Sequence, residues 1–94
     1  MKQDLLRYFG RASGRVQGVG FRCFVQTNAQ TLGVTGWVRN MEDSSVTMEM
    51  QGTARQIEDL AARIQKGSVF IKVKELALEE RPLLAAEKDF VVRY

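Results

Sequence analysis

A glycine-rich loop followed by an arginine is the segment of this sequence best suited to chemistry. Gly14, Gly18 and Gly20 lie close together, and Arg22 follows them. Glycine accepts positive φ angles, so the backbone N–H groups of such a loop can turn toward one point. Amides at the start of a helix attract anions, and a guanidinium can bind two phosphate oxygens at once. The segment therefore predicts a phosphate cradle.

Two well-known phosphate-binding motifs do not match this loop. A P-loop requires a lysine and then Ser or Thr after its last glycine, whereas Gly20 is followed by Phe21 and Arg22. A dinucleotide-binding fingerprint fails because Cys23 stands where its third glycine should be. The glycines are also compatible with a tight strand-to-helix turn that binds nothing. The residues of the loop alone leave both interpretations open.

The composition excludes several other kinds of catalytic site. The 94 residues include no histidine and a single cysteine, Cys23, which removes Ser-His-Asp triads, Cys-His pairs and histidine-based zinc sites. Only carboxylates remain as metal ligands, and we expect neither a metal nor a cofactor. Cys23 directly follows Arg22, and neighbouring helical side chains point about 100° apart. We therefore expect an ordinary buried or half-buried thiol rather than a phosphocysteine nucleophile.

The hydrophobic pattern predicts the elements that position the loop. In chain order they are a strand, a helix, two strands, a helix and two strands, at residues 6–13, 21–32, 34–41, 46–51, 53–66, 69–78 and 90–94. Gly33 and Gly67 stand where helices end, and Thr53 with Gln56 has the form of a capping box. A hairpin turn is predicted at residues 42–45. A break in the alternation near Glu75 predicts a bulge.

This order of elements is typical of an α+β, ferredoxin-like split βαβ sandwich. Such a domain has an antiparallel sheet with two helices on one face. A chain of this length is too short for a second core, so residues 1–94 are expected to form a single domain. The fold hosts many unrelated activities and does not identify the function.

Charge and the first residues bear on the expected partners. Fourteen basic and eleven acidic residues give a net charge of +3 with no basic run, and a nucleic-acid partner would normally require a denser patch. Residues 1–10 contain one short Leu5-Leu6 pair, too brief for a signal-peptide core or a membrane span. We expect a cytoplasmic protein that binds neither nucleic acid nor membranes.

Two spaced motifs resemble those of the acylphosphatase family. The family's signature loop is matched at essentially every position by Gly14-Arg15-Val16-Gln17-Gly18-Val19-Gly20-Phe21-Arg22. Its second motif is similar to Gly36-Trp37-Val38-Arg39-Asn40, with Val46 and Gly52 at the expected spacing. The closing residues 90–94 resemble the family's last strand. The resemblance thus covers the whole chain.

The resemblance implies hydrolysis of the carboxyl–phosphate bond of an acylphosphate, which yields a carboxylate and inorganic phosphate. By the same resemblance, Arg22 binds the phosphoryl group and Asn40 holds the attacking water. Further donors are the loop's backbone amides, at Val16, Gln17, Gly18, Val19, Gly20 and Phe21. We expect the protein to be a monomer.

Ser44 departs from the family pattern, which usually has glycine at this place in the hairpin. Serine tolerates a positive φ poorly, so we expect either a different type of turn or mild strain.

A non-enzymatic ferredoxin-like module that binds RNA or a small anion is the alternative function. RNA-binding domains of this kind stack bases on aromatic side chains of an open sheet face. Phe21 and Phe24 instead follow helical spacing with Val25, which predicts that they belong to the core.

Overall fold

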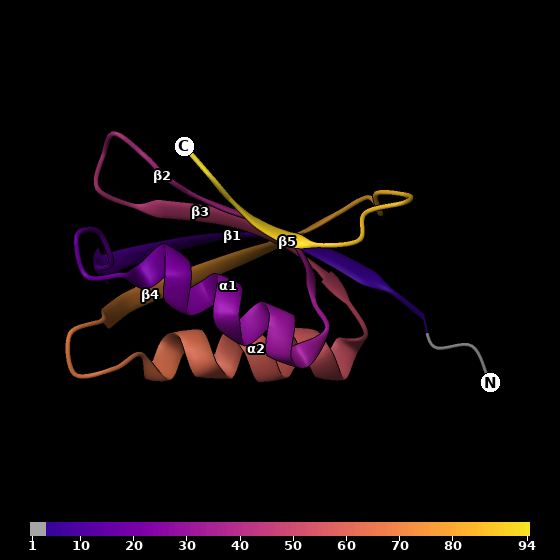
Figure 1. Ribbon diagram of the computed structural model, residues 1–94, viewed down its shortest axis with the longest axis horizontal. Helices are drawn as coiled ribbons and strands as arrows, with labels where there is room; N and C mark the ends of the chain where they lie inside the picture. The colour runs from indigo at the N-terminus through magenta and orange to yellow at the C-terminus, as the bar shows by residue number, and fades with distance from the viewer. Residues whose placement is uncertain (1–3) are drawn as a thin grey trace.

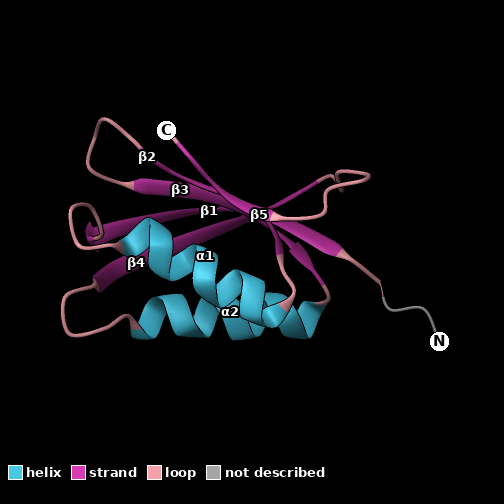
Figure 2. Ribbon diagram, in the orientation of Figure 1, coloured by secondary structure: helices cyan, strands magenta, loops and turns pink. Residues whose placement is uncertain are grey.

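The computed structural model describes residues 4–94, and a sheet and two helices form its two layers (Figure 1). The elements are β1 (Leu6–Arg15), α1 (Phe21–Leu32), β2 (Thr35–Asn40), β3 (Val46–Gly52), α2 (Ala54–Lys66), β4 (Lys72–Arg81) and β5 (Phe90–Arg93). Both helices cover the same face of the sheet (Figure 2). The predicted ferredoxin-like α+β fold is confirmed. Residues 1–3 lie outside the described residues; they are part of the stretch 1–10 in which we expected neither a signal peptide nor a membrane span.

The five strands lie in the order β4-β1-β3-β2-β5. β1 pairs antiparallel with β3 and β4, and β3 pairs antiparallel with β2. The edge strand β5 pairs parallel with β2, so the sheet is mixed rather than wholly antiparallel. The reason lies in the connection: β4 and β2 run in opposite directions, and a chain that reverses after β4 arrives beside β2 in the same direction.

The helices begin and end at the capping residues that the sequence predicted. Thr53 accepts a hydrogen bond from the Gln56 amide, and the Gln56 side chain accepts one from the Thr53 amide, which completes the capping box. Gly33 ends α1 in the left-handed conformation with φ of 79°, and Gly67 ends α2. No helix among residues 4–94 is both long enough and apolar enough to span a bilayer.

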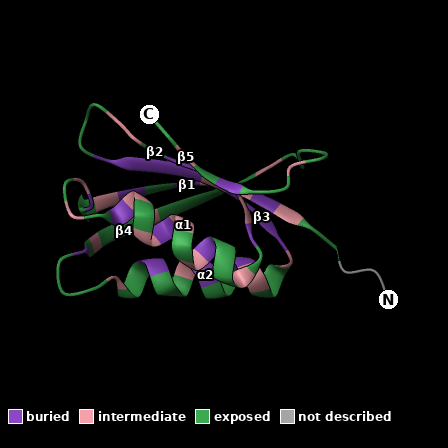
Figure 3. Cartoon of the chain, viewed as in Figure 1, coloured by how far each residue is buried: buried purple, intermediate pink, exposed green. Residues whose placement is uncertain are grey.

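The core lies between the helices and the sheet (Figure 3). From α1 it receives Phe21, Val25 and Ala29, and from α2 Ile57, Leu60 and Ile64. The predicted apolar face of β3 is entirely buried, at Val46, Met48 and Met50. Because α1 packs against β2 and β5, the residues of its first turn are fixed relative to the ends of β1 and β2.

The fourth strand begins later than its alternation predicted. Val69 is 79% exposed and lies in a bend, and the strand starts at Lys72. The Ser68 hydroxyl accepts hydrogen bonds from the Phe70 and Ile71 amides, so these residues form a turn whose side chains happen to alternate. The predicted bulge is confirmed, because the register with β1 skips Lys74.

An arginine buried on the outer face of the sheet was not foreseen. Arg7 is 2% exposed, and its guanidinium binds Glu49 at 2.6 Å and Glu87 at 2.8 Å. Gln51 accepts a hydrogen bond from the Leu84 amide and donates one to the Leu84 carbonyl. Burial raises the pKa of Glu87, but the hydrogen bonds and charge of Arg7 outweigh it and hold this pKa below its ordinary value. These contacts fasten residues 82–89 across the sheet and so fix where β5 begins.

Candidate active site

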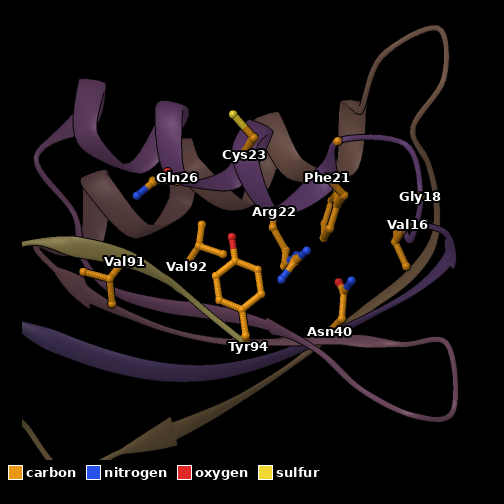
Figure 4. Close-up of a pocket in the computed structure, with 11 residues that line it drawn as sticks. Val16, Gly18, Phe21, Arg22, Cys23, Gln26, Asn40, Val91, Val92 and Tyr94 are labelled. Atoms are coloured by element: carbon orange, nitrogen blue, oxygen red, sulfur yellow. The ribbon is translucent and has the colours of Figure 1, made fainter.

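A cavity of about 630 Å³ opens where the glycine loop, α1, β2 and β5 meet (Figure 4). Its lining consists of Val16, Gly18, Gly20, Phe21, Arg22, Cys23, Gln26, Asn40, Val91, Val92 and Tyr94. The predicted pair Arg22 and Asn40 is therefore brought together, along with four of the six predicted loop residues. Gln17 and Val19 do not line the cavity, and sequence reasoning had not singled out Gln26 or the residues of β5.

The loop needs glycine for its backbone rather than for space. Gly18 and Gly20 have φ angles of 72° and 77°, yet a Cβ at either position would meet nothing within 4 Å. Val16 and Phe21, each 1% exposed, anchor the two ends of the loop in the core. A loop with buried ends and an unobstructed tip can present its amides to a ligand.

The N-terminus of α1 is open to an anion. Its N-cap is Gly20, no side chain caps it, and its first turn contains no acidic residue. The first N–H groups of a helix have no partner within the helix and carry its positive dipole end. In α2 the Thr53 side chain fills this role, so the contrast within one chain marks the start of α1 as a candidate anion site.

Arg22 reaches from the first turn of α1 into the cavity (Figure 4). Its Nη1 donates a long hydrogen bond of 3.4 Å to the Arg93 carbonyl, and its guanidinium carbon lies 4.7 Å from the centre of the Tyr94 ring. Within residues 4–94 it forms no ion pair with a carboxylate. Most of its donors are therefore available to an anionic ligand.

Asn40 ends β2 and holds an unusual acceptor. Its Oδ1 atom is buried and has no hydrogen-bond partner among the described residues. Leaving a buried acceptor unsatisfied costs about 1–3 kcal/mol, and buried polar groups in native proteins are rarely left so. Figure 4 shows the Asn40 amide and the Arg22 guanidinium directed into the same space. The amide is thus placed to bind a donor beside an anion.

Cys23 differs from its expected burial. It is exposed and lines the cavity, whereas we expected a buried or half-buried thiol. Figure 4 shows its sulfur directed away from Arg22 and Asn40, as the angle between neighbouring helical side chains requires. The geometry agrees with the expectation that it does not act as the nucleophile on a phosphoryl group held by Arg22.

The hairpin that follows Asn40 contains the departure noted at Ser44. Ser44 adopts a φ of 76°, which is the left-handed conformation that a glycine would favour, so of the two expectations strain applies. Asp43 accepts hydrogen bonds from the Ser45 amide at 3.0 Å and the Ser45 hydroxyl at 2.6 Å. These bonds, with the charge of Arg11, hold the pKa of Asp43 below its ordinary value.

A metal centre is not evident in the described part of the chain, and the aromatic side chains at the start of α1 belong to the core. Residues 4–94 contain no group of three or more acidic, cysteine or histidine side chains that could hold a metal ion. Phe21 is buried and Phe24 is partly buried against the core, as expected, so neither can stack a base.

Comparisons with known proteins agree on one family. A family model for acylphosphatase matches residues 8–92. An acylphosphatase from Clostridium beijerinckii is 40% identical over 96% of this chain and 100% of its own length, and one from Clostridium acetobutylicum is 42% identical over 94% and 97%. The crystal structure of acylphosphatase from Bacillus subtilis superposes on this chain with a TM-score of 0.89 at 35% sequence identity. The superposition covers 95% of this chain and 99% of the Bacillus subtilis chain.

Ser44→Gly tests the strain in the hairpin. Glycine adopts the observed φ without a Cβ clash but is freer in the unfolded chain, so the free energy of unfolding should be unchanged or rise by up to about 1 kcal/mol. Chemical denaturation measures this. Ser45→Gly is the matched control, and it should destabilise because it removes the hydroxyl that binds Asp43. A marked loss of stability in Ser44→Gly would contradict strain at this residue.

Proposed function

The chain belongs to the acylphosphatase family and hydrolyses the carboxyl–phosphate bond of acylphosphates, and we propose that Arg22 holds the phosphoryl group while Asn40 orients the attacking water. The observation that carries this division is the buried, unpartnered oxygen of Asn40 in the cavity that Arg22 enters. The backbone amides of residues 16–21 complete the phosphate site.

Phosphate binding follows from charge and from the open helix terminus. The Arg22 guanidinium supplies a permanent positive charge and can donate to two phosphoryl oxygens at once. The N–H groups of the loop and of the uncapped start of α1 add donors that are already in place. Together they stabilise the charge that develops on the equatorial oxygens during the reaction.

Asn40 acts on the nucleophile. Its Oδ1 accepts a hydrogen bond from the water and turns an oxygen lone pair toward phosphorus. The water oxygen forms a bond to phosphorus while the bond from phosphorus to the acyl oxygen breaks. The acyl group leaves as a carboxylate, a good leaving group that needs no general acid. The proton of the water passes to a phosphate oxygen, and the products are a carboxylate and inorganic phosphate.

The proposal extends to the setting in which the enzyme works. It acts without a metal or cofactor, as a cytoplasmic monomer, and binds neither nucleic acid nor membranes. The modest net charge of +3, spread along the chain, supports the absence of a nucleic-acid partner. A single symmetric peak of monomer mass in gel filtration is the expected result, and a concentration-dependent shift to larger mass would contradict it.

Arg22→Lys tests the phosphate ligand. An ammonium is a point charge and cannot reproduce the two-pronged guanidinium contact, so turnover should fall severely and inorganic phosphate should inhibit much more weakly. Steady-state kinetics with phosphate as competitive inhibitor measures both. Arg55→Lys, at an exposed position on α2, is the matched control and should behave as wild type. Near-normal phosphate affinity in Arg22→Lys would remove Arg22 from its role.

Asn40→Ala tests the orientation of water. Losing one positioning group that acts in the transition state commonly costs about 10²–10³ in kcat. We therefore expect a folded variant that binds inorganic phosphate within a few-fold of wild type and loses at least about a hundredfold in kcat. Asn28→Ala, which removes an amide from α1 outside the cavity, is the control. Retained turnover with weakened phosphate binding would make Asn40 a substrate ligand instead.

Removal of metals tests the independence of the reaction. Arg22 and the loop amides supply the positive potential that a metal would otherwise provide. Phosphate release from acetyl phosphate or benzoyl phosphate should be unchanged by EDTA. A loss of activity that magnesium or zinc restored would show that the reaction needs a metal.

A further inference from the structure

Gln17 belongs to the glycine loop, but its side chain serves another part of the fold. Its Nε2 donates one hydrogen bond to the Met41 carbonyl at 2.7 Å and a second to the Ser45 carbonyl at 2.9 Å. Both N–H groups of the amide are therefore committed to the hairpin between β2 and β3. The side chain contributes nothing to the lining of the cavity.

The two carbonyls lie at the point where Asn40 leaves the sheet. Met41 is the next residue, and its amide donates to the Ser45 carbonyl at 2.9 Å. Asn40 itself pairs in register with Val46, the residue after Ser45. The Gln17 amide thus bridges the chain on both sides of the hairpin directly beside Asn40.

No other side chain of the loop provides such a link. Val16 and Phe21 fix the loop to the core, and Gly18 and Gly20 have no neighbours that a Cβ would meet. In the part of the chain that the structure describes, the hydrogen bonds of Gln17 are the only ones from a loop side chain to the hairpin. Apart from these bonds, the spacing between the loop and Asn40 is set by β3, which pairs with both β1 and β2.

We propose that Gln17 is a positioning residue, whose side-chain amide fixes the phosphate-binding loop relative to the water held by Asn40. The inference rests on the proposed roles of Arg22 and Asn40. Glutamine suits this task because its amide offers two donors to two acceptors. Glutamate would set a carboxylate against two carbonyls, and asparagine is one methylene shorter.

Gln17→Met keeps the length of the side chain and removes both donors. Each carbonyl keeps its backbone donor, so the fold should survive with a thermal midpoint within a few degrees of wild type. The expected effect is a split: kcat falls by at least about tenfold, because small misplacements of reacting groups are costly, while inorganic phosphate binds within a few-fold of wild type. Gln17→Asn, which keeps an amide on a shorter side chain, should show the same split.

Gln56→Met is the matched control. This glutamine also ties two backbone segments together, at the Leu32 carbonyl and the Thr53 amide, but lies in α2 outside the cavity. Its replacement should lower the thermal midpoint and leave kcat unchanged. A residue with a merely structural role would behave as Gln56 does, so a Gln17→Met variant that loses stability but keeps kcat overturns the inference.

A double-mutant cycle in kcat between Gln17→Met and Asn40→Ala decides whether Gln17 acts through Asn40. If it does, adding Gln17→Met to Asn40→Ala should change kcat by less than about twofold. Losses that multiply would overturn the link. Full turnover in Asn40→Ala would overturn the proposed roles and the inference with them. Normal turnover in Gln17→Met beside an impaired Asn40→Ala would overturn the inference alone.

Discussion

The uncovered backbone at Gly18 and Gly20 of the phosphate loop is the constraint on which the described architecture depends. A backbone anion site must leave its N–H groups uncovered, and here the loop turns through two left-handed glycines into a helix that no side chain caps. Such a segment contributes little stability of its own. Val16 and Phe21 compensate by burying both of its ends in the core, so the packing of α1 on the sheet holds the loop in shape.

The strand order explains how two distant segments reach one cavity. β1 and β2 are each antiparallel to β3, which lies between them, so both end on the same side of the sheet. The loop follows β1 and Asn40 ends β2, and the intervening strand sets their spacing. The parallel strand β5 then adds a wall beside β2, held at its start by residues that Arg7 and Gln51 fasten to the outer face.

Features of the fold that depend on nearby residues could be predicted from the sequence, whereas features that depend on distant residues could not. The capping box, the terminal glycines and the alternation of β3 depend on neighbours within a few residues, and all were predicted. The burial of Arg7 depends on Glu87, eighty residues away, and no pattern along β1 indicates it. The start of β4 was misplaced because a turn held by Ser68 imitates alternation. The motifs predicted Arg22 and Asn40 as a pair, but the direction of the Gln17 side chain required the position of the hairpin.

The unpartnered oxygen of Asn40 lowers the stability of the ligand-free fold but is needed for the proposed chemistry. An apolar side chain of similar size would remove the buried, unsatisfied oxygen and with it a penalty of about 1–3 kcal/mol. Selection for stability alone would therefore discard the residue to which the chemistry is assigned, and selection for activity must keep it. Sequences optimised only for the ligand-free fold would drift toward well-packed proteins of the same shape that bind phosphate and turn nothing over.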